Sequence, residues 1–299
     1  MDIRDKSYAP VAALIPAQIF FGSLPVIGKV VLAVLPPFAL VGIRTAITAV
    51  ILVVIQAFRG RFWLKDKRDY WRFAVLSLFG VVLNQLFFIT GLSLTKASNT
   101  SLLAVLIPVF ALTVGSIAGF EKLTTAKIIG IILAAGGVIF LIDPRNASFS
   151  SQTTLGDLCI VLNCLAYGIY VATSKAAIIR NGTFRSMMWV FIFASIICVP
   201  LGAVSLSRVN VAAVSTQIWM IVVYIAIFAT AAPYLLNAWA LSKVNPSTVA
   251  VFVYLQPLIG FVLAVIFLDE HINLTFVIAA CLIFVGVYLA TKKFVPSEI

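Results

Sequence analysis

The stretch PSTVAVFVYLQPLIGFVLAVIFLDEH, Pro246 to His271, carries a proline in the middle of a segment long and apolar enough to cross a membrane as a helix. A second stretch, ASNTSLLAVLIPVFALTVGSIAGFEK, Ala97 to Lys122, has the same arrangement. When the two are laid over each other without a gap, Pro108 falls on Pro257, an offset of 149 residues (257 less 108). A helix-breaking residue that recurs at the same depth indicates two copies of one structural unit.

The composition around these stretches is that of a membrane protein. Hydrophobic residues make up 63% of the 299 residues and charged residues 10%, against about 25% charged in an ordinary soluble domain. A helix needs about 20 apolar residues to cross the hydrocarbon layer. The chain therefore predicts an all-α membrane protein with ten transmembrane helices. These are expected at about 10–31, 37–58, 71–93, 97–119, 125–142, 155–178, 184–205, 216–239, 246–268 and 273–293.

The net charge of +11 is explained by membrane topology. With the N-terminus in the cytoplasm, most Lys and Arg residues fall on the cytoplasmic side, as membrane insertion requires. The dense basic and aromatic stretch 59–71 fits a cytoplasmic loop with an interfacial aromatic belt. We therefore expect both termini in the cytoplasm, a location in the inner membrane, and no nucleic-acid partner.

The repeat extends beyond the two prolines. Residues 91–141 align without a gap on 240–290, and at an offset of 146 Phe21-Gly22 aligns on Tyr167-Gly168. Each copy then holds five helices, at 8–142 and 155–293. Because five is odd, the second copy must enter the membrane from the opposite side, which gives two inverted five-helix repeats. Inverted repeats are typical of transporters, whose substrate site lies between the halves near the midplane.

The two prolines are predicted to bend the fourth and ninth helices. Proline frees the carbonyl four residues upstream. A bilayer tolerates this where neighbouring groups or a water-filled cavity satisfy the carbonyl. Pro108 and Pro257 are therefore candidate hinges beside a central cavity.

These features resemble the EamA family of the drug/metabolite transporter superfamily. Each half has the mid-span proline and then a glutamate thirteen residues on, at Glu121 and Glu270. Each also has a Gly-Val pair near the end of its last helix and an aromatic-Gly-x6-Lys pattern in its first. The resemblance covers nearly the whole chain. It implies a basket of ten helices, alternating access, and small polar metabolites as substrates, often amino acids and usually exported.

No enzyme site is expected. The sequence offers no cluster of His, Asp and Glu within a segment, so we predict no catalytic residues, no metal and no cofactor. Proton-coupled carriers usually bury a carboxylate or histidine. Its apparent absence favours uncoupled transport, exchange, or coupling through the substrate, although Asp157 leaves the coupling open.

Polar residues inside the segments are the best candidates for a substrate site, because their burial in lipid is costly. Several share a helical face, as Asn163, Tyr167, Tyr170 and Ser174 do. The candidate substrate-binding residues are Gln18, Arg44, Asn84, Gln85, Asn163, Tyr167, Tyr170, Tyr234, Asn237, Tyr254 and Gln256.

Arg44 has two interpretations. It lies inside the second segment with no acidic residue in its own helix. It either binds an anionic group of the substrate or extends outward to the membrane surface.

The leading hypothesis is therefore a secondary transporter that exports an amino acid or derivative. The alternatives are an importer or exchanger of an anionic, phosphorylated or nucleotide-like metabolite, and a membrane-embedded lipid-handling enzyme or scaffold. The expected partners are a small-molecule substrate and membrane lipid, and the protein is expected to be a monomer or homodimer.

Overall fold

The structure, a computed structural model, describes residues 9–119, 124–142, 152–244, 249, 252–253, 255–269 and 274–291. Within these residues the secondary structure is helical, as expected, and no strand occurs. The helices are α1 Ala9–Ala12, α2 Leu14–Leu32, α3 Pro37–Arg59, α4 Lys67–Ser77, η1 Leu78–Leu83, α5 Asn84–Leu94, α6 Ala97–Leu103, α7 Leu106–Ile117, α8 Thr125–Ile142, α9 Gln152–Asn181, α10 Thr183–Leu206, η2 Val211–Ala213, α11 Thr216–Ala226, η3 Ile227–Ala231, α12 Ala232–Lys243, α14 Leu255–Leu268 and α15 Leu274–Thr291.

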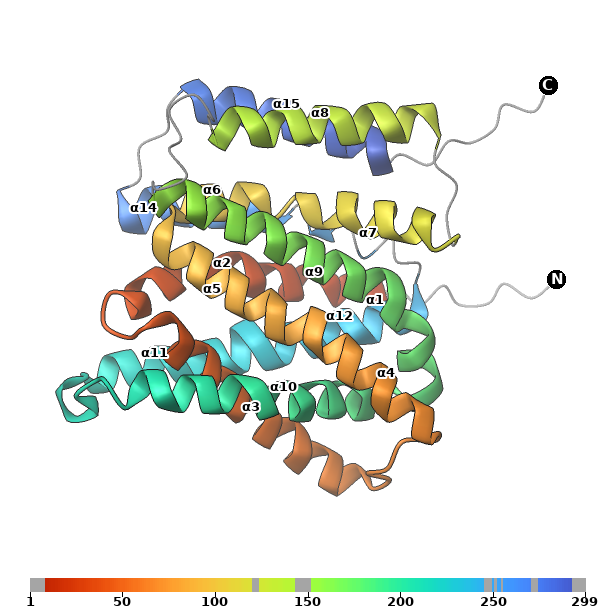
Figure 1. Ribbon diagram of the computed structural model, residues 1–299, viewed down its shortest axis with the longest axis vertical. Helices are drawn as coiled ribbons and strands as arrows, with labels where there is room; N and C mark the ends of the chain where they lie inside the picture. The colour runs from red at the N-terminus through yellow and green to blue at the C-terminus, as the bar shows by residue number, and fades with distance from the viewer. Residues whose placement is uncertain are drawn as a thin grey trace.

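Seven helical stretches of the described chain are long and apolar enough to cross a membrane, and shorter apolar helices include Leu258–Leu268 and Val277–Gly286. In Figure 1 most helices run across the view and are stacked along the long axis. The α8 and α15 helices lie side by side at the top, and α3, α10 and α11 lie at the bottom. In helices the backbone N–H and C=O groups form hydrogen bonds within the segment, as the hydrocarbon layer of a membrane requires.

The helix boundaries follow the apolar pattern with two extensions. The third segment begins at Lys67, because the side chain of Asp66 accepts a hydrogen bond from the Arg68 amide at 2.9 Å and caps α4. The sixth segment, α9, runs for 30 residues from Gln152 to Asn181 and exceeds the predicted 155–178. Polar residues at its two ends are therefore part of the helix.

The fourth segment is broken just before its proline. Helix α6 ends at Leu103, α7 begins at Leu106, and Ala104 and Val105 form the turn between them. Because Pro108 has no amide hydrogen, the Ala104 carbonyl loses its usual partner. The Ile107 amide donates to that carbonyl at 3.1 Å instead.

The segment that contains Pro257 has the same arrangement. Helix α14 begins at Leu255, so Pro257 is its third residue, as Pro108 is of α7. The Gln256 amide donates to the Val253 carbonyl at 3.0 Å. This bond is the counterpart of the one before Pro108, at the same offset along the chain.

Two π-helical segments add a second pair of irregularities. The η1 segment follows α4, and η3 follows α11. Their first residues, Leu78 and Ile227, are separated by the offset that separates the prolines. Single π-turns interrupt the regular i→i−4 pairing and are frequent at functional sites.

The glycines of the two aromatic-glycine pairs pack against these broken helices. A Cβ at Gly22 would lie 3.0 Å from the Ile259 Cβ, and a Cβ at Gly168 would lie 2.7 Å from the Phe110 Cβ. The first helix of each half therefore approaches the proline-containing helix of the other half at backbone distance. Phe110 and Ile259 are again related by the offset of the prolines.

Candidate functional site

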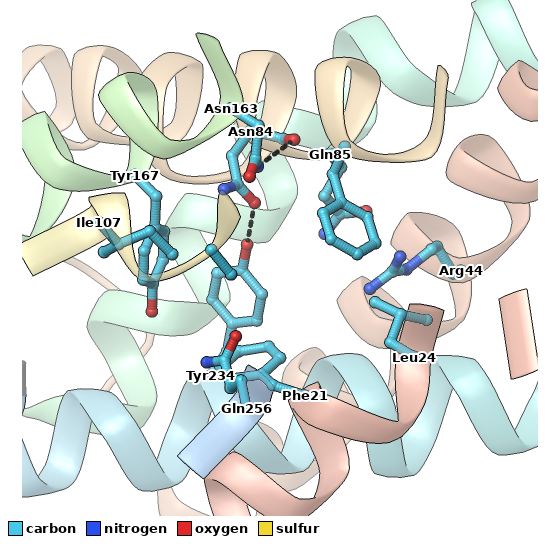
Figure 2. Close-up of a pocket in the computed structure, with 12 residues that line it drawn as sticks. Phe21, Leu24, Arg44, Asn84, Gln85, Ile107, Asn163, Tyr167, Tyr234 and Gln256 are labelled. Atoms are coloured by element: carbon cyan, nitrogen blue, oxygen red, sulfur yellow. Dashed lines mark hydrogen bonds between the residues drawn. The ribbon is translucent and has the colours of Figure 1, made fainter. Parts of the chain in front are cut away.

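A cavity lies where seven helical segments from both halves of the chain meet. It lies beside the α6–α7 break, with α2, α3, α5, α9, α12 and α14 around it (Figure 2). Its lining residues are Phe21, Leu24, Arg44, Asn84, Gln85, Phe88, Ala104, Ile107, Asn163, Tyr167, Tyr234 and Gln256.

The cavity is small in this structure. About 50 Å³ is open to the centres of water-sized molecules, and roughly 10 to 15 Å³ suffices for one water. A second cavity of about 10 Å³ adjoins it and shares Phe21, Ile107, Tyr167 and Gln256. The space fits a few water molecules, so a metabolite requires the surrounding helices to separate.

Arg44 is a buried cation in the wall of this cavity. Its side chain is 2% exposed, and Figure 2 shows it directed toward the cavity from α3. Its Nε donates to Thr230 Oγ1 at 2.8 Å, and Nη2 donates to the Ala229 carbonyl at 3.2 Å. These partners belong to η3, whose disturbed backbone pairing supplies an acceptor. Arg44 therefore turns inward and does not extend to the membrane surface.

The charge of Arg44 has no counterion in the described part of the chain. Both ion pairs found there involve Asp69 of α4. The Nη1 group of Arg44 is buried and has no hydrogen-bond partner. A buried guanidinium donor without an acceptor is costly.

Gln85 offers a second unpaired donor in the same wall. Its side chain is 2% exposed, and its Nε2 group is buried with no partner at regular hydrogen-bond geometry among the described residues. Its Oε1 accepts a long hydrogen bond of 3.4 Å from Thr45 Oγ1. The cavity is therefore lined by two side chains, Arg44 and Gln85, that each have an N–H group to donate.

Tyr234 holds the opposite wall together. Its hydroxyl lies 2.8 Å from the Gly80 carbonyl and 2.9 Å from Asn84 Oδ1, and it can donate to one of them at a time. The side-chain Nδ2 of Asn163 donates to the backbone carbonyl of Asn84 at 2.8 Å. The Tyr234 ring also meets those of Phe21, Tyr167 and Phe191 edge-on. The Gly80 carbonyl belongs to η1, so both π-segments accept a side-chain donor from another helix.

A chain of amides closes the cavity toward the adjoining one. Gln256 Nε2 donates to Gln18 Oε1 at 2.5 Å, and Gln18 Nε2 donates to Asn237 Oδ1 at 3.2 Å. Asn237 in turn donates to the Pro233 carbonyl at 3.0 Å. This chain links α2, α12 and α14 across the two halves.

The structure thus brings most of the predicted site residues together. Arg44, Asn84, Gln85, Asn163, Tyr167, Tyr234 and Gln256 line the larger cavity, and Gln18 and Asn237 line the adjoining one. Tyr170 lies outside the larger cavity. Its ring stacks on Tyr167 at 5.7 Å and its hydroxyl lies 3.6 Å from Met187 Sδ. Tyr254, Glu121, Glu270 and His271 lie outside the described residues.

Some contributors were not predicted from the sequence. Ala104 and Ile107, at the proline break, line the cavity. The Ala229 carbonyl holds Arg44 together with Thr230, which shares a predicted helical face with Tyr234 and Asn237. The equivalent prolines Pro108 and Pro257 predict the break, but no local sequence pattern predicts a π-turn.

Asp157 is a buried carboxylate near the start of α9. It is the sixth residue of the long α9 helix, near the helix end, and is 2% exposed. Among the described residues, no group of three or more His, Cys, Asp or Glu side chains is placed to hold a metal ion.

Comparison with known proteins gives one family. The model of the EamA-like transporter family matches the chain twice, at residues 9–143 and 154–292. An uncharacterized transporter of Archaeoglobus fulgidus is 26% identical over 267 residues, which cover 89% of this chain and 91% of the relative. The uncharacterized transporter YetK of Bacillus subtilis is 22% identical, covering 96% of this chain and 88% of the relative.

A plant relative and a solved structure extend the comparison. The WAT1-related protein At3g53210 of Arabidopsis thaliana is 25% identical over 248 residues, covering 73% of this chain and 67% of the relative. A crystal structure that is 19% identical in sequence has a TM-score of 0.64 and covers 94% of this chain and 96% of its own. At that identity the structural likeness supports the fold alone.

Proposed function

The chain belongs to the EamA-like transporter family, and from that membership we propose that it exports an amino acid or amino-acid derivative across the inner membrane. It is a multi-pass membrane transporter and not an enzyme, since its family and its named relatives are transporters. The expectation of a non-enzymatic carrier of this family is confirmed. We propose the substrate class, the direction of transport and the inner-membrane location.

The unpaired donors of Arg44 and Gln85 carry the proposal for the substrate. Both are buried, both line the cavity, and one is a cation without a counterion in the described chain. A carboxylate supplies the acceptor oxygens and the negative charge that these groups lack. Charge-assisted hydrogen bonds to guanidinium are about twice as strong as neutral ones.

The remaining wall suits the other groups of an amino acid. The rings of Tyr167, Tyr234 and Phe21 form an aromatic surface that favours an apolar side chain or an ammonium group. The amide oxygens of Asn84 and Gln256 lie in the same wall and can accept hydrogen bonds from an ammonium group. The proposed site therefore matches carboxylate, ammonium and side chain with different parts of one cavity.

For the architecture we propose ten transmembrane helices in two inverted five-helix repeats, 8–142 and 155–293. Three pairs of irregularities support the repeat: the breaks before Pro108 and Pro257, the segments η1 and η3, and the packing of Gly22 and Gly168. The double match of the family also supports it. Both termini are then on one side, which the charge distribution assigns to the cytoplasm.

The mechanism proposed is alternating access around the central cavity. The cavity now fits only a few water molecules, so the helices around it must separate to admit a metabolite. Pro108 and Pro257 are the proposed hinges, because each helix already lacks one regular hydrogen bond there. Membrane lipid surrounds the assembly, which acts as a monomer or homodimer.

Counterflow uptake in proteoliposomes tests the proposal. Vesicles preloaded with one unlabelled amino acid at a time are given the labelled one outside, and entry is compared with empty vesicles. We expect one chemical class of amino acid to enter faster in preloaded vesicles. The Arg44→Gln variant should lose this acceleration, and Arg208→Gln, an exposed residue between α10 and α11, should retain it.

A second candidate substrate follows from the same cation. A phosphorylated or nucleotide-like metabolite also supplies acceptor oxygens for Arg44. Acceleration by such anions, with no response to any amino acid, would replace the amino-acid proposal by this one. No counterflow with either class, from folded protein, would contradict both and favour a lipid-handling scaffold.

A further inference from the structure

We propose that Asp157 is a proton-binding site that couples transport to a proton gradient; the inference rests on the transporter function proposed above. Asp157 lies on α9, ten residues before the cavity residue Tyr167. At 1.5 Å per residue this is about 15 Å along the helix. The carboxyl group therefore lies near the edge of the hydrocarbon layer, at one end of the cavity-lining helix.

The carboxylate is held by neutral donors. Thr95 Oγ1 donates to Asp157 Oδ1 at 2.5 Å, and Asn99 Nδ2 lies 3.2 Å from Oδ2 and 3.4 Å from Oδ1. Thr95 is the residue that ends α5, and Asn99 lies in the first turn of α6. Asp157 thus ties α9 to the junction of α5 and α6.

The charged groups around this site lie outside ion-pair distance. Within the described residues, α5 and α6 contain no titratable side chain. Lys96 lies in the turn between them with an exposed side chain, and Lys29 lies on the neighbouring α2. The ion pairs found among the described residues involve Asp69 and not Asp157. On α9 itself the nearest titratable group is Cys159, which is half-buried.

Asp69 shows what an ion-paired aspartate looks like in this fold. It is also fully buried, but Arg180 and Arg72 lie 2.6 and 3.1 Å from its carboxylate and Asn181 donates to it. Asp69 holds the other end of α9 through Arg180 and Asn181. Asp157 has no such compensation, and membrane carboxylates of this kind serve as proton relays.

Protonation changes the contacts of Asp157 in a defined way. One proton taken from water by Oδ2 converts an acceptor into a hydroxyl group. That hydroxyl oxygen is a weaker acceptor than a carboxylate oxygen, and its own hydrogen competes with the N–H of Asn99 for the space between the two groups. The tie between α9 and α6 is then weakened, and the proton returns to water when the tie re-forms.

Two of these helices, α5 and α9, line the cavity, and the third, α6, ends directly before a lining residue. Asn84 and Gln85 come from α5, Asn163 and Tyr167 come from α9, and Ala104 follows α6 directly. A change at Asp157 therefore acts on the helices that must separate to admit substrate. This gives the proton a route by which to favour one orientation of the carrier.

The test uses reconstituted full-length protein and the substrate found by counterflow. A gradient of one pH unit should drive accumulation of labelled substrate, up to about tenfold for one proton per molecule. Asp157→Asn should abolish this accumulation and keep counterflow exchange, because Asn preserves shape and one acceptor. Asp157→Glu should retain at least part of the accumulation.

A second measurement is independent of folding defects in the variants. Wild-type vesicles that contain a pH-sensitive dye should report proton movement when substrate is added. Two results would overturn the proton site and leave the transporter proposal standing. The first is counterflow that does not depend on pH and moves no protons. The second is unchanged accumulation by Asp157→Asn. No counterflow at all in the wild type overturns the transporter proposal and the proton site with it.

Discussion

Arg44 shows how a single residue can define a binding site. A guanidinium group in a membrane segment needs acceptors, and Thr230 and the Ala229 carbonyl satisfy only part of it. Nη1 remains unpaired in a cavity wall that also contains the unpaired amide of Gln85. The sequence identified both residues as candidates, but whether Arg44 pointed inward depended on η3, which lies 185 residues away in the chain.

Gln85→Leu tests whether the second donor serves the substrate. We expect apparent substrate affinity to fall several-fold, since one neutral hydrogen bond contributes about 1 kcal/mol. The thermal stability of the empty protein should change little, because a buried donor without a partner is removed. Substrate dependence of counterflow and a thermal unfolding assay measure the two quantities. Unchanged affinity would remove Gln85 from the site.

Tyr234→Phe tests the structural role of a hydroxyl group that has hydrogen-bond partners. Its removal leaves the Gly80 carbonyl and Asn84 Oδ1 without this donor. We expect a loss of stability of about 1 to 2 kcal/mol, seen as a lower melting temperature. Tyr224→Phe, half-buried on the preceding helix α11, is the matched control and should melt as the wild type does. Equal melting temperatures for both variants would refute the structural role of Tyr234.

At the scale of the helices, the proline break and the π-helical segments lie beside the candidate site. The apolar pattern predicted where the described helical segments lie, because bilayer thickness sets length and hydrophobicity sets position, while α4 and α9 are longer than predicted. The doubled proline predicted the α6–α7 break. The π-segments and the Asp157 contacts could not be predicted, since they depend on partners from distant helices.

Pro108→Ala tests the break as a hinge. Alanine supplies the amide hydrogen that lets the Ala104 carbonyl re-form its regular bond, so α6 and α7 should straighten. We expect counterflow to slow by about tenfold, equivalent to 1.4 kcal/mol in the barrier. The melting temperature should stay equal or rise.

The control for that experiment is Pro37→Ala. Pro37 is the first residue of α3, where the helix leaves an amide unpaired anyway. Its replacement should leave the transport rate unchanged. Wild-type rates in both Pro108→Ala and Pro257→Ala would show that the kinks are static.

The packing of α3 on α10 is another element-scale feature with a direct test. A Cβ at Gly42 would lie 2.7 Å from the Gly202 Cα and 2.8 Å from the Cys198 carbonyl. Gly42→Ala should therefore destabilise the protein by about 1 to 3 kcal/mol. Gly115→Ala, where nothing lies within 4 Å, should be neutral in the same unfolding assay. The reverse order of stabilities would contradict this helix contact.

For the whole molecule, the inverted arrangement predicts which loops share a side of the membrane. Lys65 lies between α3 and α4, and Arg208 lies just beyond α10, and both are exposed. In a variant without other cysteines, Lys65→Cys should react with an impermeant thiol reagent only after cells are opened. Arg208→Cys should react in intact cells. The opposite pattern would place the termini outside the cytoplasm.

The recognition of a carboxylate by Arg44 is the central claim at this scale, because it assigns a substrate class to the cavity. Competition in counterflow measures it directly: the transported amino acid and its carboxamide analogue, which lacks the negative charge, are compared as inhibitors. The wild type should prefer the amino acid by about tenfold or more, since a hydrogen bond to a charged group contributes 1.5 to 3 kcal/mol. Arg44→Gln should lose most of that preference. An unchanged preference in Arg44→Gln would contradict the account.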